Sequence, residues 1–152
     1  MSRKYDKKLN FILTKSQDEV EDVYNYDVEV FTDSPDFEWS LSSLKEEMQG
    51  GWQIFSARLN DEIVAVAFLK EKDSSLLTKN TPIKMVYQGN GFSHQIKEFF
   101  EGEAKTRKIK ELKHYCSSHN FRMISLNENH GYFRTPRAFD GNKYLTEWRK
   151  IL

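Results

Sequence analysis

The residues best suited to chemistry lie in the stretch 88–93, which reads Gln-Gly-Asn-Gly-Phe-Ser. It lies between a β-rich run at residues 81–87 and an amphipathic helical pattern that begins near Phe92. A strand, a glycine turn and a helix N-terminus together present unpaired backbone N–H groups and the positive end of a helix dipole at one place. Such a place binds phosphate, so the stretch predicts a site for a phosphate-bearing ligand, although Gly-Asn-Gly is also a common turn sequence.

Other residues offer a nucleophile or a base. His114 and Cys116 share one face of an expected strand, which is compatible with a Cys/His nucleophile, but a single Cys beside a sheet is more commonly a small core residue. An acidic and aromatic segment at residues 26–38 would suit the binding of an amine, or it is a solvated loop. Its acidic candidates are Glu29, Asp33, Asp36 and Glu38. No Cys or His pair has the spacing of metal ligands, so no metal site is expected.

The elements that must position these groups alternate along the chain. Helices are predicted to open at Ser16, to span residues 41–48, to begin near Phe92 and to span residues 121–129. Strands are predicted at residues 9–14, 52–59, 63–69, 81–87, 109–115, 133–139 and 144–152. Residues 73–80 are expected to form a loose polar connection. This order predicts an α+β fold around one sheet.

Composition narrows the class of protein. The chain has 152 residues, of which 38% are hydrophobic, so a single domain over residues 1–152 with a substantial core is expected. Lys plus Arg and Asp plus Glu both number 23, which disfavours nucleic acid and anionic membranes as partners. One Cys excludes an internal disulfide, and no apolar run approaches the ~20 residues of a membrane span. We therefore expect a cytoplasmic protein.

Three ordered motifs resemble the GNAT superfamily of N-acetyltransferases. The match covers residues 81–132 directly, and the elements before and after it occur in the order which that fold requires. The motifs are Thr81-Pro82-Ile83, then Gln88-x-x-Gly91-x-Ser93, then Asn120-x-x-Met123-x-x-Leu126-Asn127-Glu128-x-x-Gly131-Tyr132.

The resemblance implies a central mixed, mostly antiparallel sheet with helices on both faces. It also implies a splayed parallel strand pair, here residues 81–87 and 109–115, and acetyl-CoA as co-substrate. Backbone groups of Ile83, Lys84 and Met85 would hold the pantetheine arm, and Asn120 would contact it or simply cap a helix. The pyrophosphate would meet backbone N–H groups of Gln88, Gly89, Asn90, Gly91, Phe92 and Ser93.

The implied activity is transfer of an acetyl group to a primary amine, on a small molecule or a protein, by direct attack in a ternary complex. Many members of the family carry a Tyr as general acid where this chain has Asn127, and an amide is a poor proton donor. The catalytic candidates are His114, Asn127 and Glu38, with the acid unassigned. A catalytically silent acyl-CoA-binding or regulatory module is the alternative, and a homodimer is compatible with either. A nucleic-acid reader using residues 144–150 conflicts with the zero net charge.

Overall fold

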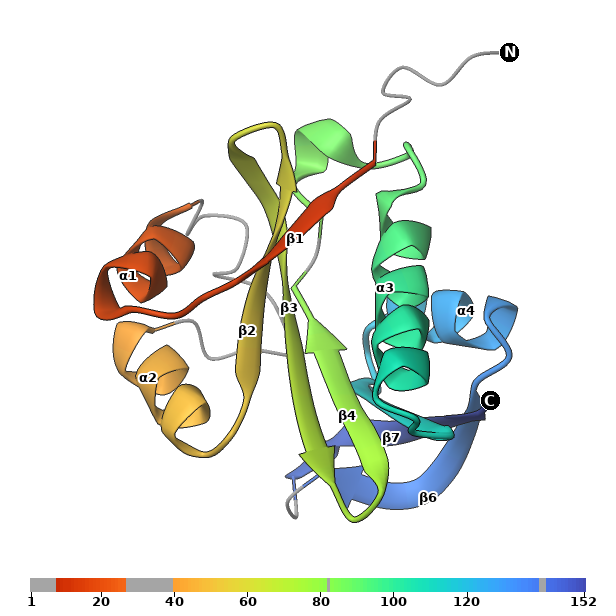
Figure 1. Cartoon of the computed structure of the whole chain (residues 1–152). Helices are drawn as coiled ribbons and strands as arrows, with labels where there is room; N and C mark the ends of the chain where they lie inside the picture. The colour runs from red at the N-terminus through yellow and green to blue at the C-terminus, as the bar shows by residue number, and fades with distance from the viewer. Residues whose placement is uncertain (1–7, 27–39, 82, 140–141) are drawn as a thin grey trace.

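A computed structural model describes residues 8–26, 40–81, 83–139 and 142–152, which build one seven-stranded sheet in the order β1-β2-β3-β4-β5-β7-β6 (Figure 1). All neighbouring strands are antiparallel except β4 and β5, so the predicted mixed α+β class is confirmed. The strands are β1 (Asn10–Leu13), β2 (Gln53–Leu59), β3 (Glu62–Lys72), β4 (Ser75–Asn80), β5 (Glu111–Ser117), β6 (Phe133–Phe139) and β7 (Asn142–Ile151). The helices are α1 (Gln17–Asn25), α2 (Leu41–Gln49), α3 (Phe92–Thr106) and α4 (Phe121–Asn129).

Helices cover both faces of the sheet. Figure 1 shows α1 and α2 on one side and α3 and α4 on the other. On β5, Leu112 and Cys116 pack in the cluster that contains the apolar face of α3, whereas Tyr115 packs with Val20 and Leu44 of α1 and α2. Strand β3 is buried on both faces from Ile63 to Leu69, as its unbroken apolar run predicts.

The helices begin where their sequences indicate. Ser16 accepts a hydrogen bond from the Glu19 backbone N–H, and Ser40 does the same for Ser43. Asn120 caps α4 by accepting from the Met123 backbone N–H at 3.2 Å. These local contacts mark the starts of α1, α2 and α4, whereas α3 has no side-chain cap.

Residues 73–80 are not the expected loose connection. Asp73 and Ser74 both have positive φ, 51° and 66°, and turn the chain so that β4 pairs antiparallel with β3. A two-residue turn of this kind normally contains Asn or Gly, so the Asp-Ser sequence hid the hairpin. The prediction was wrong because β4 is Ser75–Asn80.

The strand predicted at residues 81–87 is also wrong. Only Thr81 and Lys84 continue toward β3, through N–H bonds to the carbonyls of Val66 and Val64, and Met85–Tyr87 forms a 3₁₀ turn. The parallel pair is therefore β4 with β5, and β5 begins two residues later than predicted.

The parallel pair separates soon after it forms. Its three paired positions end at Thr78 and His114. Strand β4 continues to Asn80 against β3, and β5 continues to Ser117 against β7, so each strand follows its antiparallel neighbour away from the other. The splay predicted from the family resemblance is present, one element earlier in the chain than expected.

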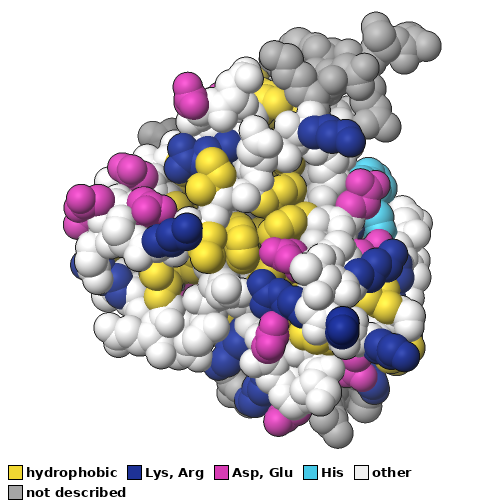
Figure 2. Space-filling model, in the orientation of Figure 1, with side chains coloured by type: hydrophobic (Ala, Val, Ile, Leu, Met, Phe, Trp, Pro, Cys, Tyr) yellow, Lys and Arg dark blue, Asp and Glu magenta, His cyan; other side chains and the backbone are white. Residues whose placement is uncertain are grey.

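On the face that Figure 2 presents, Lys and Arg side chains are interspersed with Asp and Glu, so that face has no patch of a single sign. None of the helices in the described ranges has the length and apolar character needed to cross a bilayer. Within the same ranges, no three His, Cys, Asp or Glu side chains gather as metal ligands.

Candidate functional site

A cleft of about 370 Å³ opens where β4 and β5 stop pairing. Its walls come from the end of β4, the glycine turn, the first turn of α3 and the first turns of α4. Of the residues predicted to bind the co-substrate, Ile83, Gln88, Gly89, Gly91, Phe92, Ser93 and Asn120 line it. Lys84, Met85 and Asn90 do not: Lys84 pairs with Glu62, Met85 is 80% exposed, and Asn90 is buried within the turn.

The glycine turn presents backbone donors to this cleft. Gly89 and Gly91 have φ of 84° and 80°, a region that side chains with a Cβ rarely adopt. Gly91 is the N-cap of α3 and supplies no capping side chain. The N–H groups of Phe92, Ser93 and His94 have no acceptor among the described residues, so they are available to an anion.

Two amide side chains hold the turn in shape. Asn90 is buried and donates to the carbonyls of Tyr87 and Gln88, at 3.0 and 3.3 Å. The Gln88 side chain donates to the Ile83 carbonyl at 3.1 Å. The amide nitrogen of Asn90 is therefore occupied within the turn.

Arg122, which sequence reasoning missed, adds positive charge to the cleft. Its Nη1 donates to Oε1 of Gln88 at 2.7 Å, and it lines the cleft from the first turn of α4. A guanidinium beside a turn with free N–H groups suits a phosphate ligand. A basic residue two positions after Asn120 is the sequence signal that would have found it.

Asn80 provides a buried acceptor without a partner. Its side chain is 6% exposed and lines the cleft at the end of β4. Nδ2 donates to the Thr81 carbonyl at 3.0 Å, which fixes the orientation of the amide, and Oδ1 has no hydrogen-bond partner among the described residues. Since an unpaired buried acceptor is costly, Oδ1 is suited to receive a donor from a ligand. It was missed because residues 73–80 were expected to be a loop.

Asn120 serves as a helix cap and also lines the cleft. The capping prediction is confirmed, and contact with a ligand stays a prediction that the same position allows. Tyr26, at the end of α1, shares a hydrogen bond of 3.1 Å with the hydroxyl of Thr81, which also lines the cleft. The α1 side of the sheet therefore meets the cleft at Thr81.

A buried polar cluster joins α3, α4 and β5. Lys97, which is 0% exposed, donates from Nζ to Oδ1 of Asn127, and Nδ2 of Asn127 is 3.8 Å from Sγ of Cys116. Burial lowers the pKa of Lys97 to about 7, although Cys116 and Glu101 act in the opposite direction. The Lys97 ammonium lies 4.5 Å from the centre of the Tyr132 ring, whose burial raises the pKa of its phenol.

The catalytic candidates are thus in different places. His114 is 1% exposed beneath the cleft, where Nδ1 lies 3.1 Å from Oγ1 of Thr78. Burial, reinforced by Lys97, lowers its pKa well below the usual value, so it is neutral at pH 7. Asn127 joins the cluster around Lys97. Glu38 lies outside the described residues, so the structure does not place it.

Two histidines meet at the edge of the cleft. Nδ1 of His94 lies 2.8 Å from Nε2 of His130, a distance that requires one ring to donate and the other to accept. Burial is the main cause of the lowered pKa of His130, and the neighbouring His94 adds to it. His94 also lines the cleft through the first turn of α3.

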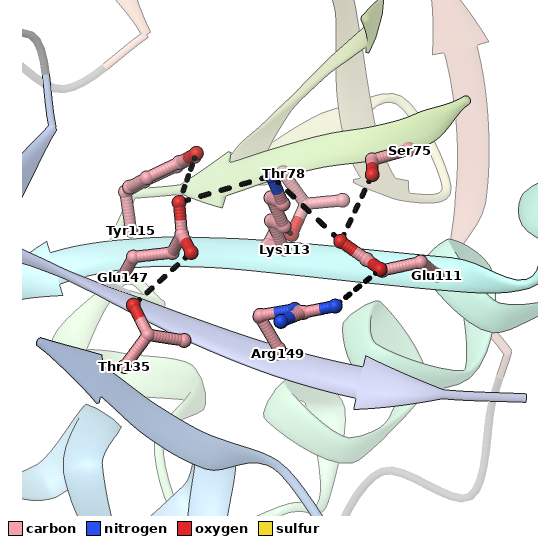
Figure 3. Close-up of polar contacts among 8 residues, drawn as sticks. All are labelled: Ser75, Thr78, Glu111, Lys113, Tyr115, Thr135, Glu147 and Arg149. Atoms are coloured by element: carbon pink, nitrogen blue, oxygen red, sulfur yellow. Dashed lines mark hydrogen bonds and ion pairs between the residues drawn. The ribbon is translucent and has the colours of Figure 1, made fainter. Parts of the chain in front are cut away.

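The opposite face of β5 carries a separate network, drawn in Figure 3. Oε1 of Glu111 accepts from the Ser75 hydroxyl at 3.0 Å, and Oε2 lies 2.6 Å from Nη2 of Arg149. These contacts join β4, β5 and β7 beside the strands that form the splay. Burial acts to raise the pKa of Glu111, but the hydrogen bonds from Arg149 and Ser75 outweigh it and the pKa is lowered. The network is held by its own members, which indicates a structural role.

No protein-family model matches the sequence, and no curated protein matches it. Solved structures do share its fold. An acetyltransferase from Thermus thermophilus is 18% identical, with a TM-score of 0.73 over 96% of this chain and 98% of that one. A ribosomal-protein-alanine N-acetyltransferase from Brucella melitensis is 14% identical, with a TM-score of 0.70 over 95% and 100%.

A GNAT family acetyltransferase from Elizabethkingia anophelis, solved with acetyl-CoA bound, is similar to the same extent. It is 13% identical, with a TM-score of 0.70 over 97% of this chain and 100% of that one. At such low identity the likeness concerns the fold, and it extends over nearly the whole of each chain.

Proposed function

We propose that this chain, which has the GNAT fold, is an N-acetyltransferase that transfers an acetyl group from acetyl-CoA to a primary amine. The observation that carries the proposal is the cleft at the separation of β4 and β5, where the N–H groups of Phe92, Ser93 and His94 have no acceptor within the described ranges. A ligand with phosphates at one end and a polar arm fits such a cleft.

Each wall of the cleft has a part in holding acetyl-CoA. The N–H groups of Phe92, Ser93 and His94 would bind the pyrophosphate with help from Arg122. The unpartnered Oδ1 of Asn80 would accept from an amide N–H of the pantetheine arm. The sequence assigned the arm to Ile83, Lys84 and Met85, and only Ile83 keeps that position beside the cleft.

The chemistry would proceed in a ternary complex. A neutral amine attacks the thioester carbonyl, and the sulfur leaves as the C–N bond forms. Tyr26 and Thr81 mark where the α1 side of the sheet reaches the cleft, so the acceptor would approach from that side. A small-molecule amine and a protein amine are both retained as acceptors.

A binding assay combined with a turnover assay tests the proposal. Saturating acetyl-CoA should raise the melting temperature, and a panel of amines should release free thiol from it in the presence of the protein. The panel should include polyamines, amino acids and peptides with free N-termini or lysines. Binding without thiol release from any amine would favour the silent module, and absence of binding would reject both functions.

A further inference from the structure

Lys97 is a buried cation without a counter-ion in the described part of the chain. Its exposed fraction is 0%, and it takes part in none of the ion pairs found there. An ammonium group taken out of water normally needs a carboxylate beside it. Since an apolar side chain could occupy the same helical position, packing alone does not account for a lysine here.

The hydrogen bonds of Lys97 lead to a sulfur atom. Its Nζ donates to Oδ1 of Asn127, and Nδ2 of Asn127 donates toward Sγ of Cys116 at 3.8 Å. An amide nitrogen has two N–H groups, and the second has no acceptor among the described residues. An ammonium group can only donate, so it contacts Oδ1 of Asn127. The other end of the amide, Nδ2, is therefore turned toward Sγ of Cys116.

Neither Lys97 nor Asn127 lines the cleft, and both are 0% exposed, but each lies next to lining residues on its own helix. Phe92 and Ser93 line the cleft at the start of α3, and Lys97 follows about one turn further along the helix. Figure 1 shows α3 running back alongside β4, toward the end where β4 and β5 still pair. On α4, Met123 and Leu126 line the cleft, and Asn127 is the next residue. A CoA arm that enters at the glycine turn would bring its sulfur toward this end.

Resting on the proposed function, we infer that Lys97 is a positioning residue which acts through Asn127 to stabilise the thiolate that leaves acetyl-CoA. The acceptor nitrogen forms the C–N bond, and the C–S bond breaks with its electron pair on sulfur. The proton of the attacking amine passes to solvent. In this role the second N–H of Asn127 Nδ2, which is not the one directed at Cys116, and the positive charge of Lys97 would stabilise the new thiolate, so the amide need not supply a proton.

Charged and titratable groups surround Lys97 on every side. They are His114 and Cys116 from β5, His130 after α4, Tyr132, Lys150 from β7 and Glu101 from α3 itself. Glu101 is held in an ion pair by Lys150, so it is not a direct partner of Lys97. Because burial brings the pKa of Lys97 to about 7, about half of the molecules carry its charge at pH 7 and nearly all do well below it, and an anionic sulfur nearby would extend that range upward.

The test measures the acidity of the thiol in bound CoA and needs no acceptor. CoA is bound to the protein, and the ultraviolet absorbance of its thiolate is followed against pH. The same titration with desulfo-CoA, which lacks the sulfur, measures the absorbance of Cys116 and the tyrosines. This background is subtracted from the titration with CoA. In the wild type we expect the bound thiol to titrate at least one pH unit below free CoA, because a nearby positive charge favours the thiolate.

Two substitutions separate the charge from the shape of the site. Lys97→Met keeps an unbranched side chain without charge, and it should raise the thiol pKa by about one unit or more relative to the wild type. Asn127→Asp keeps the shape but places a carboxylate on Lys97, so it should raise the thiol pKa as well. Lys79→Met is the matched control, because Lys79 is another largely buried lysine, paired with Glu47 on the opposite face of the sheet, and its loss should leave the thiol pKa unchanged.

The outcomes separate this inference from the proposed function. Bound CoA with the same thiol pKa in the wild type, Lys97→Met and Asn127→Asp would overturn the role of Lys97 and leave CoA binding intact. Equal shifts in Lys97→Met and Lys79→Met would also overturn it, since the effect would then be general. Failure of CoA to bind the wild type would overturn the proposed function itself.

Discussion

The hydroxyl of Tyr115 donates a 3.0 Å hydrogen bond to Oε2 of Glu147, which joins the centre of β5 to its antiparallel neighbour β7 (Figure 3). Both residues are buried, with exposed fractions of 7% and 6%. The Thr135 hydroxyl donates to the other carboxylate oxygen at 3.0 Å, and Lys113 lies 4.0 Å from Glu147. A carboxylate supported in this way ties together the half of the sheet that diverges from β4.

Tyr115→Phe should therefore destabilise the fold while keeping the ring. Removing one donor from a buried carboxylate is expected to lower the free energy of unfolding by about 1–3 kcal/mol. Urea unfolding of the wild type and the variant measures the difference. Thr135→Val, which removes the second hydroxyl donor, should have an effect of the same sign. Unchanged midpoints in both variants would mean that Glu147 does not depend on these hydroxyls.

Asn80→Leu should weaken acetyl-CoA binding without lowering the stability of the free protein. Among the described residues Oδ1 has no partner, so its removal abolishes an uncompensated buried acceptor. The ligand used for comparison is 3′-phosphoadenosine 5′-diphosphate, which has the phosphates of CoA but lacks the pantetheine arm. Calorimetry should show a weakened affinity for acetyl-CoA only. Equal losses for both ligands would place Asn80 outside the pantetheine path.

Gly91→Val should abolish the stabilisation by acetyl-CoA. The residue has φ of 80°, which costs a non-glycine residue about 1–2 kcal/mol, and the new side chain would crowd the N–H groups of α3. In the wild type, ligand at a hundredfold excess over its dissociation constant should add ~2.7 kcal/mol. Gly102→Val is the control, because Gly102 lies on the same helix with open space around it. A full ligand shift in Gly91→Val would refute the assignment of the turn to the pyrophosphate.

Arg122→Gln should reduce affinity for acetyl-CoA and for 3′-phosphoadenosine 5′-diphosphate alike. Loss of a charged hydrogen bond to phosphate is expected to weaken binding about tenfold, or ~1.4 kcal/mol, at low salt. The difference from the wild type should shrink as salt is raised, because exposed charges are screened. Lys105→Gln, near the far end of α3, serves as the control and should bind like the wild type. A salt-independent loss would argue that Arg122 acts by holding Gln88 instead.

Lys97→Met should change how stability depends on pH. The folded-state pKa of Lys97 is about 7, below the unfolded value of 10.5, so between these limits the unfolded chain binds the extra proton. The wild type should gain stability relative to the variant as pH rises from 7 toward 10, with a slope of roughly 1.4 kcal/mol per pH unit. Below pH 7 the difference should level off. Parallel stability curves would mean that Lys97 keeps an ordinary pKa in the folded protein.

Several elements follow from local sequence alone. The caps at Ser16 and Asn120 identified the starts of α1 and α4, and the 3.6-residue periodicity identified α2 to within one residue. The glycines at 89 and 91 identified the turn, because their backbone angles disfavour other residues. These features depend on neighbours a few positions apart, which is why the sequence reveals them.

The second strand of the β3–β4 hairpin could not be predicted from local sequence. Its turn consists of Asp73 and Ser74 at positive φ, and neither is a glycine or an asparagine that would have indicated a hairpin. The polar residues beside the turn are also typical of a loop. Asn80 was consequently read as part of a connection, although it lines the cleft at the end of β4. Each residue of this strand that pairs with β5 meets a partner 36 positions further along the chain, so no local pattern predicts the pair.

The sequence by itself determined the class of fold and the place of the glycine turn, because periodicity, capping and backbone freedom are local properties. Only the tertiary structure decided which strand separates from β5. It also decided that Lys97 of α3 contacts Asn127 of α4 inside the core. A helical pattern that counts apolar positions treats a lysine as solvent-facing. Its burial depends on contacts with β5 and α4, which exist only once the chain has folded.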